Sequence, residues 1–176
     1  REVASLNRYR DTGGSLEPGR EETSAGGEKL DSADEETRIS AANRLALFRD
    51  RAAASALVGV LGDPSREVRV AAAMALAACG TRESVTPLLN ALEDPDDHVA
   101  QAAAVALESL TAHAVPVDLP ATAAARRRQA DAWRRWLNEH PWPKLEATLV
   151  GRIDSEDRGE QRRAIVALGH IGGDAA

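Results

Sequence analysis

The chain has 176 residues, a formal net charge of −6 and many alanines, while aromatic side chains make up only 3% of it. The acidic balance argues against nucleic-acid binding by the whole chain, because that binding depends on neutralising phosphates with Lys and Arg. The single cysteine, Cys79, excludes an intrachain disulfide framework and fits a reducing compartment. The sequence holds no run of about 20 apolar residues that would span a membrane. We therefore expect a cytoplasmic protein, whose two ends look like cuts in a longer chain.

The first segment, residues 1–33, is predicted to be a disordered linker or tail. It combines many charges with Gly-Gly or Pro-Gly pairs at 13–14, 18–19 and 26–27. Its apolar residues show almost no helical spacing, so it cannot bury enough surface to offset the entropy of ordering. Order is expected from residue 34 onward.

Five helices are predicted in the next part of the chain, because apolar residues recur there at helical spacing. They cover residues 35–48, 52–62, 65–79, 83–93 and 96–110. Asp63-Pro64 and Asp94-Pro95 interrupt the pattern, and each Asp is expected to cap the following helix with Pro in the first turn. Gly80 is expected to end its helix as a left-handed C-terminal cap.

Much of this pattern returns after a shift of 31 residues, which maps Val68 onto Val99 and Leu76 onto Leu107. A weaker return after 92 residues maps Leu76 onto Leu168. A fixed period of this size predicts a stack of repeats in which each helix pair buries its apolar face against its neighbours. These five residues are therefore expected to be structural.

The period breaks after Thr111. Residues 112–120 contain two prolines and are predicted to form an extended loop. A helix over 122–139 follows and carries several Arg and Trp side chains. Regular pairing is expected to resume with helices over 144–153 and 157–169.

The stretches from Asp63 to Leu76 and from Asp94 to Leu107 resemble the HEAT repeat, in the short bacterial form also called the phycobilisome-lyase-type HEAT-like repeat. The resemblance implies an all-α fold, a right-handed armadillo-like α-solenoid of antiparallel helix pairs with the second helices on its concave face. The solenoid is expected to cover residues 34–176, with repeats at 34–62, 63–93, 94–120 and 143–172 and an irregular Arg/Trp helix at 121–142.

Asp63 and Arg69 match the Asp and Arg that HEAT repeats use as a ladder between neighbouring turns, so both are expected to be structural. The pattern is interrupted further along the chain. Ala100 stands at the next Arg position, and Ser155 and Gln161 replace the later pair. A continuous ladder is therefore not expected.

Two surfaces are candidates for binding a protein or peptide partner. Extended curved surfaces suit long partners, and the candidates on the concave face are Arg66, Arg69, Gln101, Glu108, Arg158 and Arg162. Arg and Trp are frequent in interface hot spots, and the candidates on the Arg/Trp helix are Arg126, Arg127, Arg128, Trp133, Arg134 and Trp136. The Trp rings could instead seal the solenoid by packing. The predicted function is a non-catalytic scaffold for protein interactions.

Two other functions stay open. One is a bilin lyase-like or chaperone subunit, because those enzymes contain similar repeats. The other is a nucleic-acid-binding HEAT protein, in which the Arg/Trp helix would pair with phosphates and stack on bases.

The sequence shows no catalytic, cofactor or metal site. None of its four histidines is followed by Glu, and no two lie four residues apart. The acidic turn Asp94–His98 lacks the Gly and the closing Glu of a calcium loop, so a capping role is expected there. Cys79 falls on the core stripe and is expected to pack as a small apolar residue.

Overall fold

The computed structural model describes residues 29–116 and 122–172, and every regular element in these ranges is helical. The α-helices are α2 (Glu35–Phe48), α3 (Ala54–Gly59), α4 (Arg66–Cys79), α5 (Val85–Ala91), α6 (Asp97–Thr111), α7 (Ala123–Glu139), α8 (Trp142–Gly151) and α9 (Arg158–Ile171). The predicted all-α fold is confirmed. The predicted disordered segment 1–33 lies outside the described residues except for 29–33, where the prediction is wrong because Leu30 is 1% exposed and packs in the core. The end of the predicted loop, 117–120, lies outside the described residues too.

The bounds of three helices differ most from the predictions. The helices expected at 52–62 and 83–93 are shorter, because 3-10 turns occupy Arg51–Ala53, Val60–Gly62 and Arg82–Ser84. Helix α8 begins at Trp142, two residues before the predicted start, since Pro143 fits the first turn of a helix, where its missing N–H is not needed.

The caps of α4 and α6 are Ser65 and Asp96, whose side chains accept hydrogen bonds from first-turn backbone N–H groups. The expectation that Asp63 and Asp94 cap these helices is wrong, because each lies two residues before the cap. Asp63 Oδ1 accepts a hydrogen bond from the Ser65 N–H at 2.8 Å, and Asp94 does the same for Asp96. Pro64 therefore precedes the helix and does not belong to its first turn.

Gly80 ends α4 in an extended conformation with φ of −63°. The expected left-handed cap is therefore wrong, and the described residues with positive φ are Arg49 and Ala112. A Cβ atom on Gly80 would lie 2.4 Å from the carbonyl oxygen of Leu76 and 3.3 Å from the side chain of Leu110. Glycine is needed at this position because a Cβ atom would collide with the last-turn carbonyl of α4 and press on Leu110, and not because of backbone handedness.

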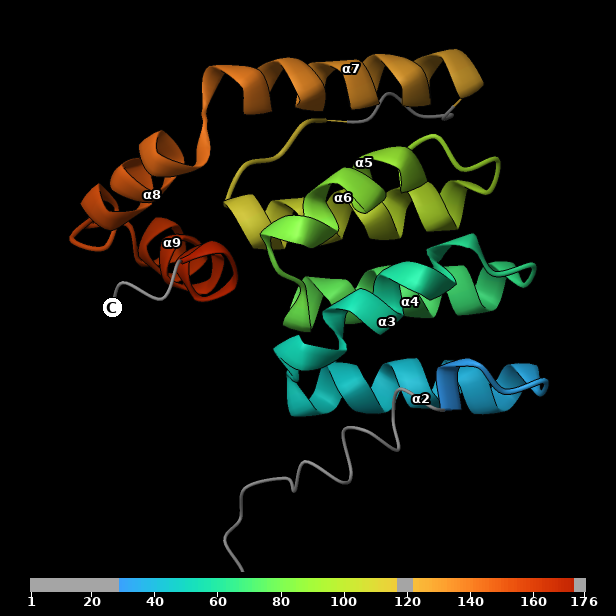
Figure 1. The fold of residues 1–176 in the computed structure, drawn as a ribbon. Helices are drawn as coiled ribbons and strands as arrows, with labels where there is room; N and C mark the ends of the chain where they lie inside the picture. The colour runs from blue at the N-terminus through green and yellow to red at the C-terminus, as the bar shows by residue number, and fades with distance from the viewer. Residues whose placement is uncertain (1–28, 117–121, 173–176) are drawn as a thin grey trace, which may run out of the picture.

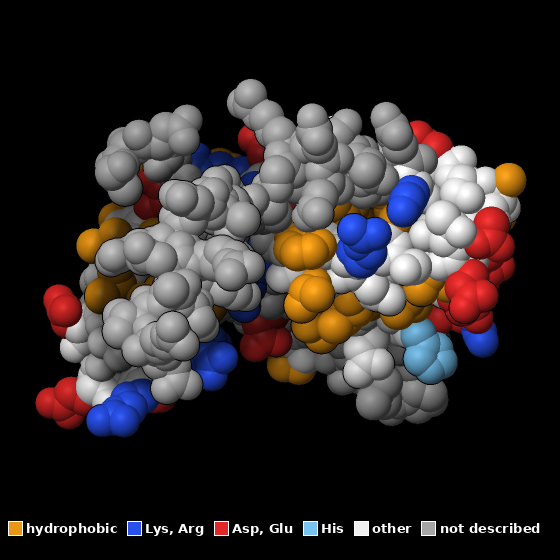
Figure 2. Space-filling view, turned by 90° about the horizontal axis from the view of Figure 1, so that it is seen from below, with side chains coloured by type: hydrophobic (Ala, Val, Ile, Leu, Met, Phe, Trp, Pro, Cys, Tyr) orange, Lys and Arg blue, Asp and Glu red, His pale blue; other side chains and the backbone are white. Residues whose placement is uncertain are grey.

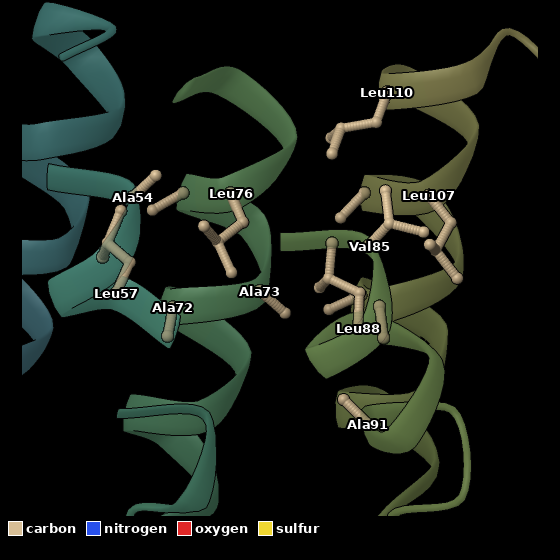
Figure 3. Packing of buried hydrophobic residues seen from close by; sticks show 14 of the residues in the cluster. Ala54, Leu57, Ala72, Ala73, Leu76, Val85, Leu88, Ala91, Leu107 and Leu110 are labelled. Atoms are coloured by element: carbon tan, nitrogen blue, oxygen red, sulfur yellow. The ribbon is translucent and has the colours of Figure 1, made fainter. Parts of the chain in front are cut away.

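Helices α2, α4 and α6 are the second helices of successive repeats and lie side by side, with α3 and α5 covering one side of the row (Figure 1). The core lies between these two layers, where Leu57 of α3 and Leu88 of α5 meet residues of α4 and α6 (Figure 3). The predicted structural residues Val68, Leu76, Val99 and Leu107 are 0% exposed, and Leu168 is partly buried against the core. Stacking thus places equivalent residues in equivalent surroundings.

The last helix pair does not continue this row. Helix α7 lies beside α5 at one end of the stack, and α9 lies beside the C-terminal ends of α4 and α6 (Figure 1). His170 Nδ1 of α9 is 3.0 Å from the Gly80 carbonyl oxygen, and Arg51 Nη2 donates to the His170 carbonyl oxygen at 2.9 Å. Arg82 forms an ion pair with Glu146 of α8. Helices α8 and α9 pack together as expected, but they fold back onto the loops of earlier repeats.

Candidate protein-interaction surfaces

Two bidentate ion pairs join neighbouring repeats on one side of the stack. Arg38 donates to the Asp63 carboxylate at 2.8 and 3.0 Å, and Arg69 donates to the Asp94 carboxylate at 2.8 and 3.1 Å. Burial raises the pKa of Asp63, but the hydrogen bonds from Arg38 and a backbone N–H outweigh burial and hold that pKa below its ordinary value. The row of arginines ends at Ala100. Arg69 is therefore engaged in a part-buried ion pair within the fold.

A groove of about 410 Å³ lies between α2 and α4 on the second-helix face, which is the side of α2, α4 and α6 away from α3 and α5. Its apolar lining residues are Ile39, Val70, Ala71 and Met74. The side chain of Met74 is 47% exposed. On the rim, Arg66 bonds to Glu67 at 2.7 Å and lies 3.4 Å from Asp96. The guanidinium of Arg66 is thus paired with carboxylates of the chain itself.

A second groove, of about 350 Å³, lies between α6 and α9. Its lining residues are Val105, Glu108, Ser109, Arg162, Arg163 and Val166. Val105 is 41% exposed and Val166 is 38% exposed. Because Val105 follows Met74 by one period of 31 residues, it occupies the equivalent position on the next second helix. The two grooves therefore share a row of exposed apolar side chains.

Sequence reasoning missed this row, since it searched for charged and aromatic groups. Met74 and Val105 lie off the buried stripe, one period apart, within runs of alanine. The sequence did hold a signal for this row. A large apolar residue recurs after one period at a position that is predicted to face solvent. An exposed apolar row of this kind is a common mark of an interaction surface.

The concave-face candidates fall into two groups in the structure. Arg66, Gln101, Glu108, Arg158 and Arg162 are exposed. Arg66 lines the α2/α4 groove, while Glu108 and Arg162 line the α6/α9 groove. Five of the six residues are thus open to solvent, and Arg69 is held in its ion pair.

One face of the Arg/Trp helix, with four of its six candidate residues, contacts the rest of the protein. Trp133 of α7 is 1% exposed and belongs to the core. Arg126 is 8% exposed and forms an ion pair with Asp97. Arg134 Nη2 lies 2.8 Å from a carboxylate oxygen of Glu93. The outward side chains of this helix include Arg127 and Arg128.

Trp136 stacks on two imidazole rings. Its ring centroid is 4.0 Å from that of His113, with 1° between the ring planes, and 4.6 Å from that of His140, with 18° between the planes. Burial lowers the pKa of His113, and the nearby His140 and Arg152 lower it further. Stacking on these two rings thus engages Trp136 within the fold. Packing therefore accounts for both Trp133 and Trp136.

The α2 end of the stack exposes further apolar groups. Leu47 is 78% exposed and Phe48 is 42% exposed at the C-terminal end of α2. Viewed from this end, hydrophobic side chains gather beside basic ones on the part of the surface that the structure describes (Figure 2). This end therefore presents a mixed apolar and basic surface.

The described residues bring together few groups with reactive chemistry. Cys79 is fully buried, its Sγ lies 3.2 Å from the Ala75 carbonyl oxygen, and burial raises the pKa of the thiol to about 11. Within residues 29–116 and 122–172, no three His, Cys, Asp or Glu side chains are placed to hold a metal ion. The helices in those ranges include none that is long and apolar enough to cross a membrane.

The stacked helix pairs and the open second-helix face define an α-solenoid, a class of protein that presents extended surfaces to its partners. A family model for HEAT repeats matches residues 27–114, which are 88 of the 176 residues. The chain belongs to the HEAT repeat family. Proteins of this family generally serve as scaffolds for protein interactions and are typically not enzymes. The comparison with curated proteins found no match to this chain.

Proposed function

We propose that this chain is a non-catalytic scaffold that binds a protein or peptide partner along its second-helix face. The observation that supports the proposal is the row of exposed apolar side chains formed by Met74, Val105 and Val166, which are 47%, 41% and 38% exposed. A partner laid along this row would contact α4, α6 and α9 at once. Binding would then be spread over several repeats, as suits a solenoid.

The size of each contact explains why an extended partner is needed. Complete burial of an apolar side chain is worth about 1.5–3 kcal/mol. Met74 and Val105 are already about half buried, so covering each adds on the order of 1 kcal/mol. Association also costs several kcal/mol of lost motion. A short peptide that touches one position would therefore bind weakly, and a segment that spans both grooves would bind well.

Nucleic-acid binding by the Arg/Trp helix and a lyase-like role receive no support from the side chains that each would need. Base stacking on the Arg/Trp helix would need open rings, yet Trp133 is 1% exposed. A lyase-like role would need a reactive group, and the one thiol, Cys79, is fully buried. Membership of the bacterial lyase-type subgroup and a cytoplasmic location stay predictions.

The proposal can be tested with two matched double variants of the full chain. Met74→Asp with Val105→Asp places two charges in the apolar row. Ala147→Asp with Val150→Asp places the same charges on exposed positions of α8. Proteins captured from a lysate of the source organism are quantified for wild type and both variants, and each captured candidate is then titrated in purified form.

A partner that binds wild type and the α8 variant equally, and the Met74/Val105 variant at least about tenfold more weakly, would support the proposal. Two burials of about 1 kcal/mol each, replaced by desolvated carboxylates, exceed the 1.4 kcal/mol that corresponds to tenfold. Equal binding by both variants would refute a role for this face. Circular dichroism and the urea midpoint serve as checks that each variant is folded.

A further inference from the structure

We infer that the α6/α9 groove takes an acidic, apolar peptide segment, with partner carboxylates on Arg162 and Arg163 and a partner apolar side chain on Val105 and Val166. This inference rests on the proposed function and adds the chemistry of the partner. It follows from a difference in ion pairing, because the arginine of the α2/α4 groove is paired within the chain and those of the α6/α9 groove are not.

Helix α9 carries three exposed arginines, Arg158, Arg162 and Arg163. None of them has an ion-pair partner among the residues that the structure describes. The nearby acidic residue Glu160 is engaged elsewhere, because it lies 3.3 Å from Arg152. The three guanidinium groups of α9 therefore have no carboxylate of the described residues within ion-pair distance.

The α2/α4 groove differs in this respect. Its arginine, Arg66, bonds to Glu67 at 2.7 Å and lies 3.4 Å from Asp96. A partner carboxylate there would compete with two carboxylates already in place. Carboxylates of a partner are thus expected at the α9 end of the face and not at the α2 end.

Apolar groups lie beside the two groove arginines that have no ion pair. Val105 and Val166 line the same groove as Arg162 and Arg163, and both valines are more than a third exposed, at 41% and 38%. A partner segment that carries both carboxylates and apolar side chains would satisfy both features at once. Contact with the valines also excludes water from the ion pairs, which strengthens them.

Glu108 favours a peptide over a nucleic acid. Its carboxylate lines the same groove, and the whole chain has a net charge of −6. A nucleic acid would bring one phosphate charge per nucleotide toward Glu108, and its backbone phosphates offer that carboxylate no donor. A peptide carries backbone N–H groups that can donate to Glu108 while its own carboxylates meet the arginines.

The test uses the full chain and a fluorescein-labelled synthetic peptide that forms an amphipathic helix of Glu and Leu. An analogue with every Glu changed to Lys serves as the charge control. Fluorescence anisotropy gives the dissociation constant of each peptide at low and high NaCl. The chain is used as wild type, as Arg162→Glu with Arg163→Glu, and as Arg135→Glu with Lys144→Glu, which reverses two exposed charges on α7 and α8.

The Glu/Leu peptide should bind wild type at least about tenfold more tightly than its Lys analogue, with affinity falling as salt screens the ion pairs. Each reversal removes an exposed ion pair with the peptide and puts repulsion between like charges in its place. Two reversals should therefore weaken binding by about tenfold, the equivalent of 1.4 kcal/mol. The Arg135/Lys144 variant should bind within about twofold of wild type.

Equal binding of the two peptides, no binding of either, or equal loss in both double variants would overturn the inference. Oligothymidylate is tested as a competitor of the peptide. If it displaces the peptide, and if its own binding disappears in the variant with Arg162→Glu and Arg163→Glu, the groove would be assigned to nucleic acid instead. The two proposals fail separately. If the Met74/Val105 variant loses a captured partner but wild type shows no preference for the Glu/Leu peptide, the scaffold function is supported. The inference that the α6/α9 groove takes an acidic peptide is then refuted.

Discussion

Replacing Leu107 by Ala is expected to lower the free energy of unfolding by about 2–5 kcal/mol. Leu107 is 0% exposed and packs in the core between the two helix layers. The change removes apolar surface from the core and leaves a cavity that stacked helices can close only in part. With a mid-range urea dependence of about 2 kcal/mol per molar, the unfolding midpoint should fall by roughly 1–2.5 M.

The matched control is Leu47→Ala, which makes the same chemical change at a helical position that is 78% exposed. Its free energy of unfolding should change by less than about 0.5 kcal/mol. Both variants are unfolded in urea and followed by far-ultraviolet circular dichroism. The assigned repeat register would be refuted if Leu107→Ala left the unfolding midpoint unchanged, or if both variants lowered it equally.

Three further predictions concern the core and its pH dependence. Cys79 in the folded chain should react with a thiol reagent at pH 8 far more slowly than in urea, because burial raises the pKa of its thiol to about 11; equal rates would contradict the assigned burial. Gly80→Ala should destabilise the chain by about 1–3 kcal/mol through overpacking, whereas Gly62→Ala, where the added Cβ has nothing within 4 Å, should have little effect. Burial lowers the pKa of His170 more than its hydrogen bond to Gly80 raises it. As the pH drops, the unfolded chain therefore takes up a proton at this imidazole before the folded chain does, and stability should fall below about pH 6.5. Urea midpoints are measured between pH 7.5 and 5.5 for wild type and for His170→Gln. An equally steep fall in both would exclude His170 as a cause.

The repeat spacing predicted the stack well, because each helix pair meets the same neighbours one period later. Val68 and Val99 are both 0% exposed for that reason. The same spacing did not identify the caps, since Asp63 satisfies a turn and an arginine before the helix starts. The sequence near Asp63 offers its carboxylate several possible hydrogen-bond donors. Which donors it meets is decided by how the helices pack.

The position of α9 could not be predicted from the sequence. It depends on contacts such as those of His170 with Gly80 and with Arg51, which join residues 90 and 119 positions apart. No local pattern reports on pairs so distant. The role of Trp133 was ambiguous for a different reason, because a large ring suits a core and an interface equally well.

The most direct test of the scaffold function is the methyl NMR spectrum of the full chain, titrated with a captured partner. The account predicts that the methyl signals of Met74, Val105 and Val166 shift first and most, while that of Val150 on α8 stays in place. Shifts confined to Val150 and its neighbours, with the Met74, Val105 and Val166 signals unmoved, would contradict binding along the second-helix face.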